Sequence, residues 1–167
     1  RNFCNKLWNA SRFVLMNTEG QDCAVPGSAG HEQLERSLAD RWILSRLSRM
    51  SAKVAAALDD YRFNEAAAAL YKFIWHEFCD WYLEAIKPTV RDHPGQQQVL
   101  RTVLNAAMRM LHPICPFVTE ALWPHVQAAG DAGVDGITLP SSELLAGAAW
   151  PDIACRVHDD EALEQFG

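Results

Sequence analysis

The residues best suited to chemistry lie in the first 17 positions, RNFCNKLWNASRFVLMN. If this stretch is an α-helix, its amides, two cations and one aromatic ring fall within one arc of about 140°. Amides pair with base edges, arginine meets phosphate, and an aromatic ring holds an unstacked base, so this face suits single-stranded RNA. A solvated face or a protein contact is the alternative, although such faces favour Glu and Lys over Asn. The arc holds Asn2, Asn5, Lys6, Asn9, Arg12, Phe13, Met16 and Asn17.

A second candidate is a basic stripe further along the chain. Arg46, Arg49 and Lys53 are spaced i, i+3, i+7 and share one side of a helix. They are candidate contacts to a phosphate backbone, with a solvated face as the alternative. His76 and Asp80 lie four residues apart, a spacing that predicts a hydrogen bond on a polar arc or, alternatively, a metal site.

Candidate catalytic patterns are weak in the sequence: it contains no P-loop, no G-x-G-x-x-G, no H-E-x-x-H and no G-x-S-x-G. The cysteines are odd in number and none has C-x-x-C spacing, which argues against a disulfide framework or a zinc site. We therefore predict reduced thiols and no catalytic residue, metal ligand or cofactor in this chain. The five cysteines are Cys4, Cys23, Cys79, Cys115 and Cys155.

Composition indicates a folded, acidic protein without a membrane span. Its 167 residues are 49% hydrophobic, enough for a core, and the net charge is −6. Residues 117–167 hold nine acids and one base, whereas residues 1–116 carry a net charge of +2. Nucleic acid would therefore have to bind at a local patch. No apolar run reaches the ~18–20 residues of a transmembrane helix. The sequence lacks a secretory signal and an initiator Met, so we expect a piece of a longer protein.

Hydrophobic periodicity predicts an all-α bundle of about five helices over residues 1–126, followed by an irregular extension over residues 127–167. Ser37 is the expected N-cap of the second helix, and the third, apolar on most sides, is the expected central helix. In the extension, ITLP predicts a short strand, AAWPDI a loop that holds Trp150, and the acid-rich stretch from Asp159 the start of a helix. The predicted helices span residues 1–17, 38–59, 64–86, 96–111 and 116–126, with a long loop over 18–36.

Four segments in this order resemble a known family: RNFCNKLWNASRFVLMN, LADRWILSRL, FCDWYLEAIKP and HPICPFVTEALWP. They look like the anticodon-binding helical domain of class Ia aminoacyl-tRNA synthetases, most closely of the bacterial valyl enzymes. The isoleucyl and leucyl enzymes, which share looser forms of these segments, are the alternative, as is a helical protein-interaction module without RNA binding.

The resemblance implies a parent ligase that attaches valine to tRNA(Val) with ATP and Mg in a catalytic domain. The HIGH and KMSKS motifs of that domain do not occur here, so the chain alone is expected to be inactive. Its expected partners are the anticodon stem-loop of tRNA(Val) and the catalytic, editing and coiled-coil domains of the parent, a cytoplasmic monomer.

The resemblance also assigns roles to side chains of the first helix, which faces the anticodon in the family. Phe13 is the expected stacking aromatic, Asn9 and Arg12 the expected base-edge or phosphate contacts, and Asn5 and Asn17 secondary contacts. Trp81 and Tyr82 are expected mainly in the core, and a position of one of them at the rim of the RNA site is the alternative.

Overall fold

The computed structural model describes residues 2–18, 35–128, 133–154 and 159–166. Most of the predicted loop over 18–36 lies outside these ranges, as do Cys23 and Cys155. The described part is mostly helical, which confirms the all-α prediction. The helices are α1 (Asn2–Thr18), α2 (Leu38–Asp59), α3 (Phe63–Lys72), the π-helix η1 (Phe73–Tyr82), α4 (Leu83–Ile86), α5 (Pro94–Leu111), α6 (Pro116–Ala128), the 3-10 turn η2 (Leu145–Gly147) and α7 (Asp160–Phe166).

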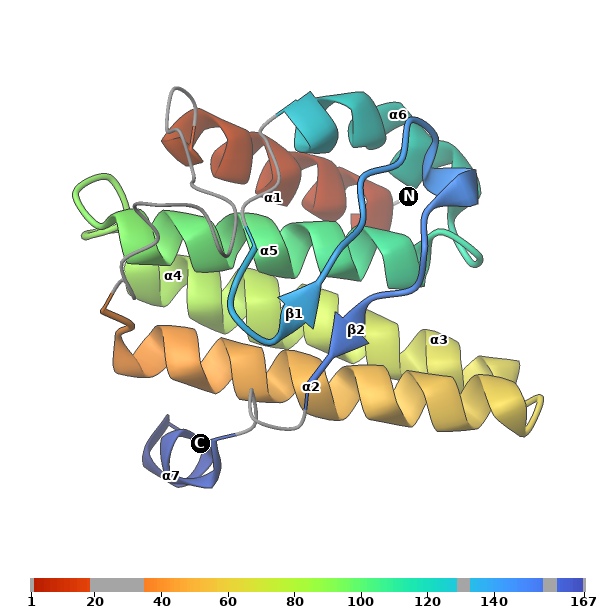
Figure 1. Ribbon diagram of the computed structural model, residues 1–167, viewed down its shortest axis with the longest axis horizontal. Coiled ribbons are helices and arrows are strands. Elements are labelled where there is room, and N and C mark those ends of the chain that lie inside the picture. The colour runs from red at the N-terminus through yellow and green to blue at the C-terminus, as the bar shows by residue number, and fades with distance from the viewer. Residues whose placement is uncertain (1, 19–34, 129–132, 155–158, 167) are drawn as a thin grey trace.

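The helices surround α5, which runs through the middle of the bundle (Figure 1). In the view of Figure 1, α1 and α6 lie above α5, while α2, α3 and α4 lie below it, with α7 beyond α2. Every residue of α5 from Gly95 to Leu111 is buried. The prediction that the third helix is central is therefore wrong.

Hydrogen bonding explains why the sequence concealed the central position of α5. Its polar residues are buried, but their side chains bond to backbone groups of other segments. Gln97 donates to the carbonyl of Val90, and Arg101 to the carbonyl of Thr18. Arg109 donates to the carbonyls of Ala149 and Pro140. The sequence of such a helix contains many polar residues, so it resembles that of a half-exposed helix even though the helix is buried.

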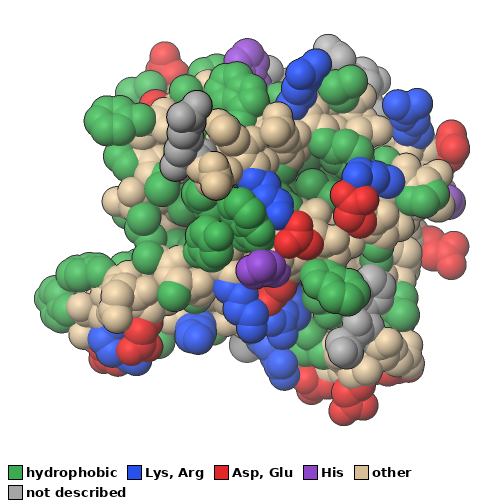
Figure 2. Space-filling model, turned by 180° about the vertical axis from the view of Figure 1, so that it is seen from behind, with side chains coloured by type: hydrophobic (Ala, Val, Ile, Leu, Met, Phe, Trp, Pro, Cys, Tyr) green, Lys and Arg blue, Asp and Glu red, His purple; other side chains and the backbone are tan. Residues whose placement is uncertain are grey.

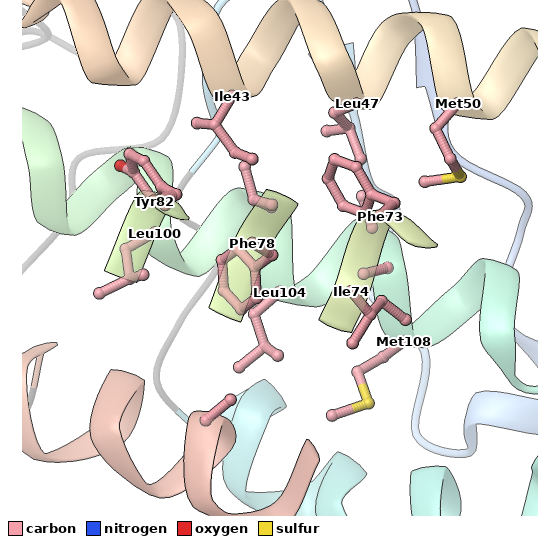
Figure 3. Close-up of a cluster of buried hydrophobic side chains, with 14 of the residues drawn as sticks. Ile43, Leu47, Met50, Phe73, Ile74, Phe78, Tyr82, Leu100, Leu104 and Met108 are labelled. Carbon is pink, nitrogen blue, oxygen red and sulfur yellow. The ribbon is translucent and has the colours of Figure 1, made fainter. Parts of the chain in front are cut away.

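The core fills the space between α2, η1 and α5 (Figure 3). In Figure 3, Ile43 and Leu47 of α2 point toward Phe73 and Phe78 of η1, and Leu104 of α5 approaches from the other side. All five side chains are at most 1% exposed. Burial of such side chains stabilises the fold by about 1.5–3 kcal/mol each.

The π-helix changes which side chains face this core. Within η1 the wider turn joins residues five apart, as where Leu83 donates to the carbonyl of Phe78. Projection at 100° per residue places Trp81 and Tyr82 on either side of Phe78, about 60° and 40° away from it. The wider turns rotate Trp81 away from the core and leave it 60% exposed, whereas Tyr82 stays fully buried. The expected core position is confirmed for Tyr82 and wrong for Trp81.

A buried hydrogen bond fastens the start of α2 to η1. Ser37 is the N-cap of α2, as the sequence predicted, and it forms a capping box with Asp40. The carboxylate of Asp40, which is fully buried, also accepts a hydrogen bond from the Tyr82 hydroxyl at 2.7 Å. Burial, together with the neighbouring carboxylate, raises the pKa of Tyr82 well above its ordinary value. The phenol therefore stays protonated and donates to Asp40.

The segment after α6 packs on the bundle. Strands β1 (Ile137–Thr138) and β2 (Asp152–Ile153) pair antiparallel, which confirms the strand expected in ITLP. AAWPDI contains β2 as well as a loop, and Trp150 stays 38% exposed instead of being held inside. The indole of Trp123 donates to the carbonyl of Ser142, a contact across the predicted boundary at residue 126. That boundary stays a prediction.

No helix in the described ranges is both long and apolar enough to cross a membrane.

Candidate nucleic-acid interface

One side of α1 is exposed along its whole length and carries most of the predicted RNA-facing residues. Asn5, Asn9 and Arg12 are exposed, as predicted, together with Trp8 and Met16. Phe13 and Asn17 are only partly exposed. The opposite side is buried against α5 and α6; it consists of Leu7, Ala10, Ser11, Val14 and Thr18.

The exposed side is thus rotated from the predicted arc toward Trp8. The ring of Phe13 packs against the core, while Trp8, absent from the predicted arc, is 49% exposed. The cause is the burial of two hydroxyl residues on the far side. Ser11 and Thr18 donate to carbonyls one turn back, so both fit inside the protein. Counting them as core positions would have found Trp8.

Arg12 is an exposed cation for which the described part of the chain provides no counter-charge. Within the described residues, no carboxylate lies within ion-pair distance of Arg12. Its neighbours on the exposed side, Asn5, Trp8 and Asn9, carry no charge. Arg12 can therefore pair with an external phosphate without first breaking an internal ion pair.

Lys6, by contrast, is held by η1. Its ammonium group forms an ion pair with Asp80 and lies 4.1 Å from the ring centroid of Trp75. The hydrogen bond from Lys6 is the main cause that lowers the pKa of Asp80 below its usual value. His76 lies 3.2 Å from the same carboxylate, which confirms the expected i,i+4 pair. Lys6 therefore serves to join α1 to η1.

Three aromatic rings extend this junction. The ring centroids of Phe3 and Tyr71 are 5.3 Å apart, and those of Tyr71 and Trp75 are 5.5 Å apart. The ring planes are inclined by 28° in the first pair and by 16° in the second. These stacks fix the start of α1 on α3 and η1, so the exposed side of α1 has a defined orientation.

At the other end of α1, Asn17 contacts the turn between α4 and α5. Its amide nitrogen donates to the carbonyl of Phe13 at 2.7 Å. Its amide oxygen accepts from Nε of Arg91 at 3.5 Å. Asn17 is therefore engaged within the protein, and sequence reasoning had not paired it with Arg91, which is 74 residues away.

The predicted basic stripe on α2 is largely neutralised. Arg46 is paired with Glu77 of η1, and this hydrogen bond is the main cause that raises the pKa of Arg46. Arg49 lies 3.7 Å from Asp160 of α7. Lys53 is exposed. Figure 2 shows the face opposite to that in Figure 1, where Lys and Arg side chains gather with acidic side chains among them.

Potential metal ligands and the buried Cys79 thiol were compared with what a metal site or a reactive thiol requires. Nowhere in those ranges do three or more His, Cys, Asp or Glu side chains gather as a metal site would require. Burial raises the pKa of the Cys79 thiol to about 12, so this thiol stays protonated at neutral pH.

Comparison with known proteins identifies the same type of domain that the sequence segments resemble. A family model described as the anticodon-binding domain of tRNA ligase matches residues 40–166, which excludes α1. The fold is similar to that of a leucyl-tRNA synthetase of Agrobacterium radiobacter K84, solved in a ternary complex with tRNA and LeuAMS. The two share 20% identity at a TM-score of 0.64, over 95% of this chain and 17% of the synthetase chain.

Proposed function

We propose that this chain, which belongs to the family of anticodon-binding domains of tRNA ligases, binds the anticodon stem-loop of a tRNA as part of a class Ia synthetase. The observation that carries the proposal is the exposed side of α1, where Arg12 has no carboxylate partner in the described residues and two amides flank it. The leucyl-tRNA synthetase of similar fold, which was solved with tRNA, supports it.

The proposed contacts divide by chemistry. Asn9 and Asn5 present amides that can pair with the edges of unstacked anticodon bases. Arg12 supplies the phosphate contact or stacks on a base. Phe13 was the expected stacking ring, but its partial burial leaves Trp8 as the second candidate for that role.

For the amino acid, we propose valine. The segments RNFCNKLWNASRF and FCDWYLE support the valyl form, and the solved relative supports a leucyl enzyme as the alternative. The chain spans 17% of the length of that relative, so the parent's ATP- and Mg-dependent ligation of valine to tRNA(Val) in the cytoplasm is also part of the proposal.

Titration with three anticodon stem-loops tests the proposal. Stem-loops with valine, leucine and isoleucine anticodons are labelled at one end and titrated with the chain at 50 and 200 mM salt. We expect the valine stem-loop to bind most tightly and binding to weaken as salt rises. Preference for the leucine stem-loop would assign the leucyl alternative. No binding of any stem-loop at 50 mM salt would contradict the proposed function.

Variants of the two aromatic residues decide which ring stacks. The Ala variant of the stacking residue should weaken binding by about 1–3 kcal/mol, and that of the other residue should not. Phe13→Ala should also lower the melting temperature because its ring packs on the core, whereas Trp8→Ala should change it little. Tyr61→Ala, an exposed ring at the turn between α2 and α3, is the control.

A further inference from the structure

A second arginine lies at the C-terminal end of the α1 surface. Arg91 is exposed in the turn between α4 and α5, and its Nε donates to the amide oxygen of Asn17. Figure 1 shows this turn at the same end of the bundle as the end of α1. Residues far apart in the sequence therefore meet here, beside the surface that carries Arg12.

The charge of Arg91 is available to a ligand. Its contact with Asn17 is long, at 3.5 Å, and uses a neutral acceptor. Within the described residues, no carboxylate lies within ion-pair distance of Arg91, including that of its neighbour Asp92. Six of the twelve other Lys and Arg residues in the described ranges pair with an acid: Lys6, Arg41, Arg46, Arg49, Arg62 and Lys87.

Asn17 gives this arginine a defined place. The side-chain nitrogen of Asn17 is fixed by the carbonyl of Phe13, so its oxygen points in one direction, toward Arg91. The contact occupies Nε and leaves the two terminal nitrogens of the guanidinium group to bind a phosphate, whose oxygens match their spacing.

We propose that Arg91 binds a backbone phosphate of the RNA and that Asn17 is a positioning residue that aims it. This inference rests on the proposed function and extends the binding surface from α1 to the turn between α4 and α5. Asn17, expected to touch RNA itself, would act through Arg91. Arg91 would contact a phosphate beyond the one at Arg12, further from the amides Asn5 and Asn9 and toward the C-terminal end of α1.

The test measures how the affinity for the valine stem-loop depends on salt. Each neutralised phosphate contributes about 0.7–0.9 to the slope of log affinity against log salt. Arg91→Gln should reduce the slope by that amount and weaken binding about sixfold at 0.1 M salt, equally for all three stem-loops. Arg91→Lys should restore the slope because it keeps the charge.

Arg62→Gln is the matched control, since it removes the same charge from an exposed arginine at the other end of the bundle. Arg62 is already paired with Asp60 and Glu65. We therefore expect the slope of log affinity against log salt to be the same for Arg62→Gln as for the wild type. If the wild type binds and Arg91→Gln leaves slope and affinity unchanged, the inference is wrong and the proposed function stands. If the wild type does not bind at 50 mM salt, both fail.

A double-mutant comparison tests the role of Asn17. Asn17→Ala should weaken binding in the wild-type background and have no further effect in Arg91→Gln, because its action passes through Arg91. Equal losses in both backgrounds would show that Asn17 contacts RNA independently, which would overturn its assignment as a positioning residue.

Discussion

Helices α1 and α2 both carry cations at helical spacing, but the neighbouring elements pair these cations with acids to different extents. On α1, Arg12 stands among exposed amides with no carboxylate within ion-pair distance in the described residues. On α2, Arg46 is paired with Glu77 and Arg49 with Asp160. Spacing along a helix thus identifies a row of cations, whereas the acids on the elements packed beside it decide which of those cations remain available to an external anion.

The largest expected effect compares paired substitutions on the two helices. Asn9→Ala with Arg12→Gln removes one base-edge contact and one phosphate contact, which should cost about 2–4 kcal/mol of binding to the valine stem-loop. Arg49→Gln with Lys53→Gln should change binding less than about twofold. A filter-binding titration measures both. A larger loss for the α2 pair would reverse the comparison.

Glu77→Gln tests whether the ion pair with Glu77 neutralises Arg46 of α2 and stabilises the fold. Arg46 is partly buried and Glu77 is 8% exposed, so loss of the acceptor charge should lower the free energy of unfolding by about 1–3 kcal/mol. Glu84→Gln, which breaks an exposed pair with Lys87, is the matched control, with about 0–1 kcal/mol expected. If urea denaturation gives equal values for both, Arg46 is free to bind an external anion.

A pH titration tests how Lys6 differs from Arg12. The pKa of Asp80 is lowered in the folded protein, so the ionised pair stabilises the fold above the unfolded pKa of about 3.9. This contribution is lost as the pH falls through the folded pKa. Lys6→Gln should move the Asp80 pKa upward toward its ordinary value, as read from the carboxyl carbon by NMR. An unmoved pKa would mean that Lys6 is as free as Arg12.

The smallest effect is expected for Asp160→Asn. The pair between Arg49 and Asp160 is exposed and 3.7 Å long, so its loss should change the free energy of unfolding by less than about 1 kcal/mol. The start of α7 should stay in place, because Asp159 accepts from the backbone of Ala162 and pairs with Arg41. A larger loss in thermal unfolding would mean that Arg49 is committed to α7.

The fold was predictable wherever local signals decide the structure. Ser37 predicted the start of α2, and Pro116 that of α6, because capping and the fixed proline angle act within a few residues. The central place of α5 was not predictable, since the partners of its polar side chains, such as Gly133 for Gln98, are distant in sequence.

In the candidate site, too, features set within one helix were predictable and features set by contacts between helices were not. The exposure of Asn5, Asn9 and Arg12 came from spacing within one helix. The neutralisation of Arg46 and the contact between Asn17 and Arg91 depend on how helices meet, which spacing does not contain. Trp8 was missed because two small hydroxyl residues lie on the buried side of α1.

The π-helix between Phe73 and Tyr82 holds more residues per turn than an α-helix, because its hydrogen bonds join residues five apart. Deleting one residue from it would let part of the segment return to α-helical turns. Since the wider turns take up the additional length, the helices on either side could keep their register after such a deletion. We therefore expect related sequences to align with a one-residue gap within residues 73–82 wherever their helix continues as an α-helix.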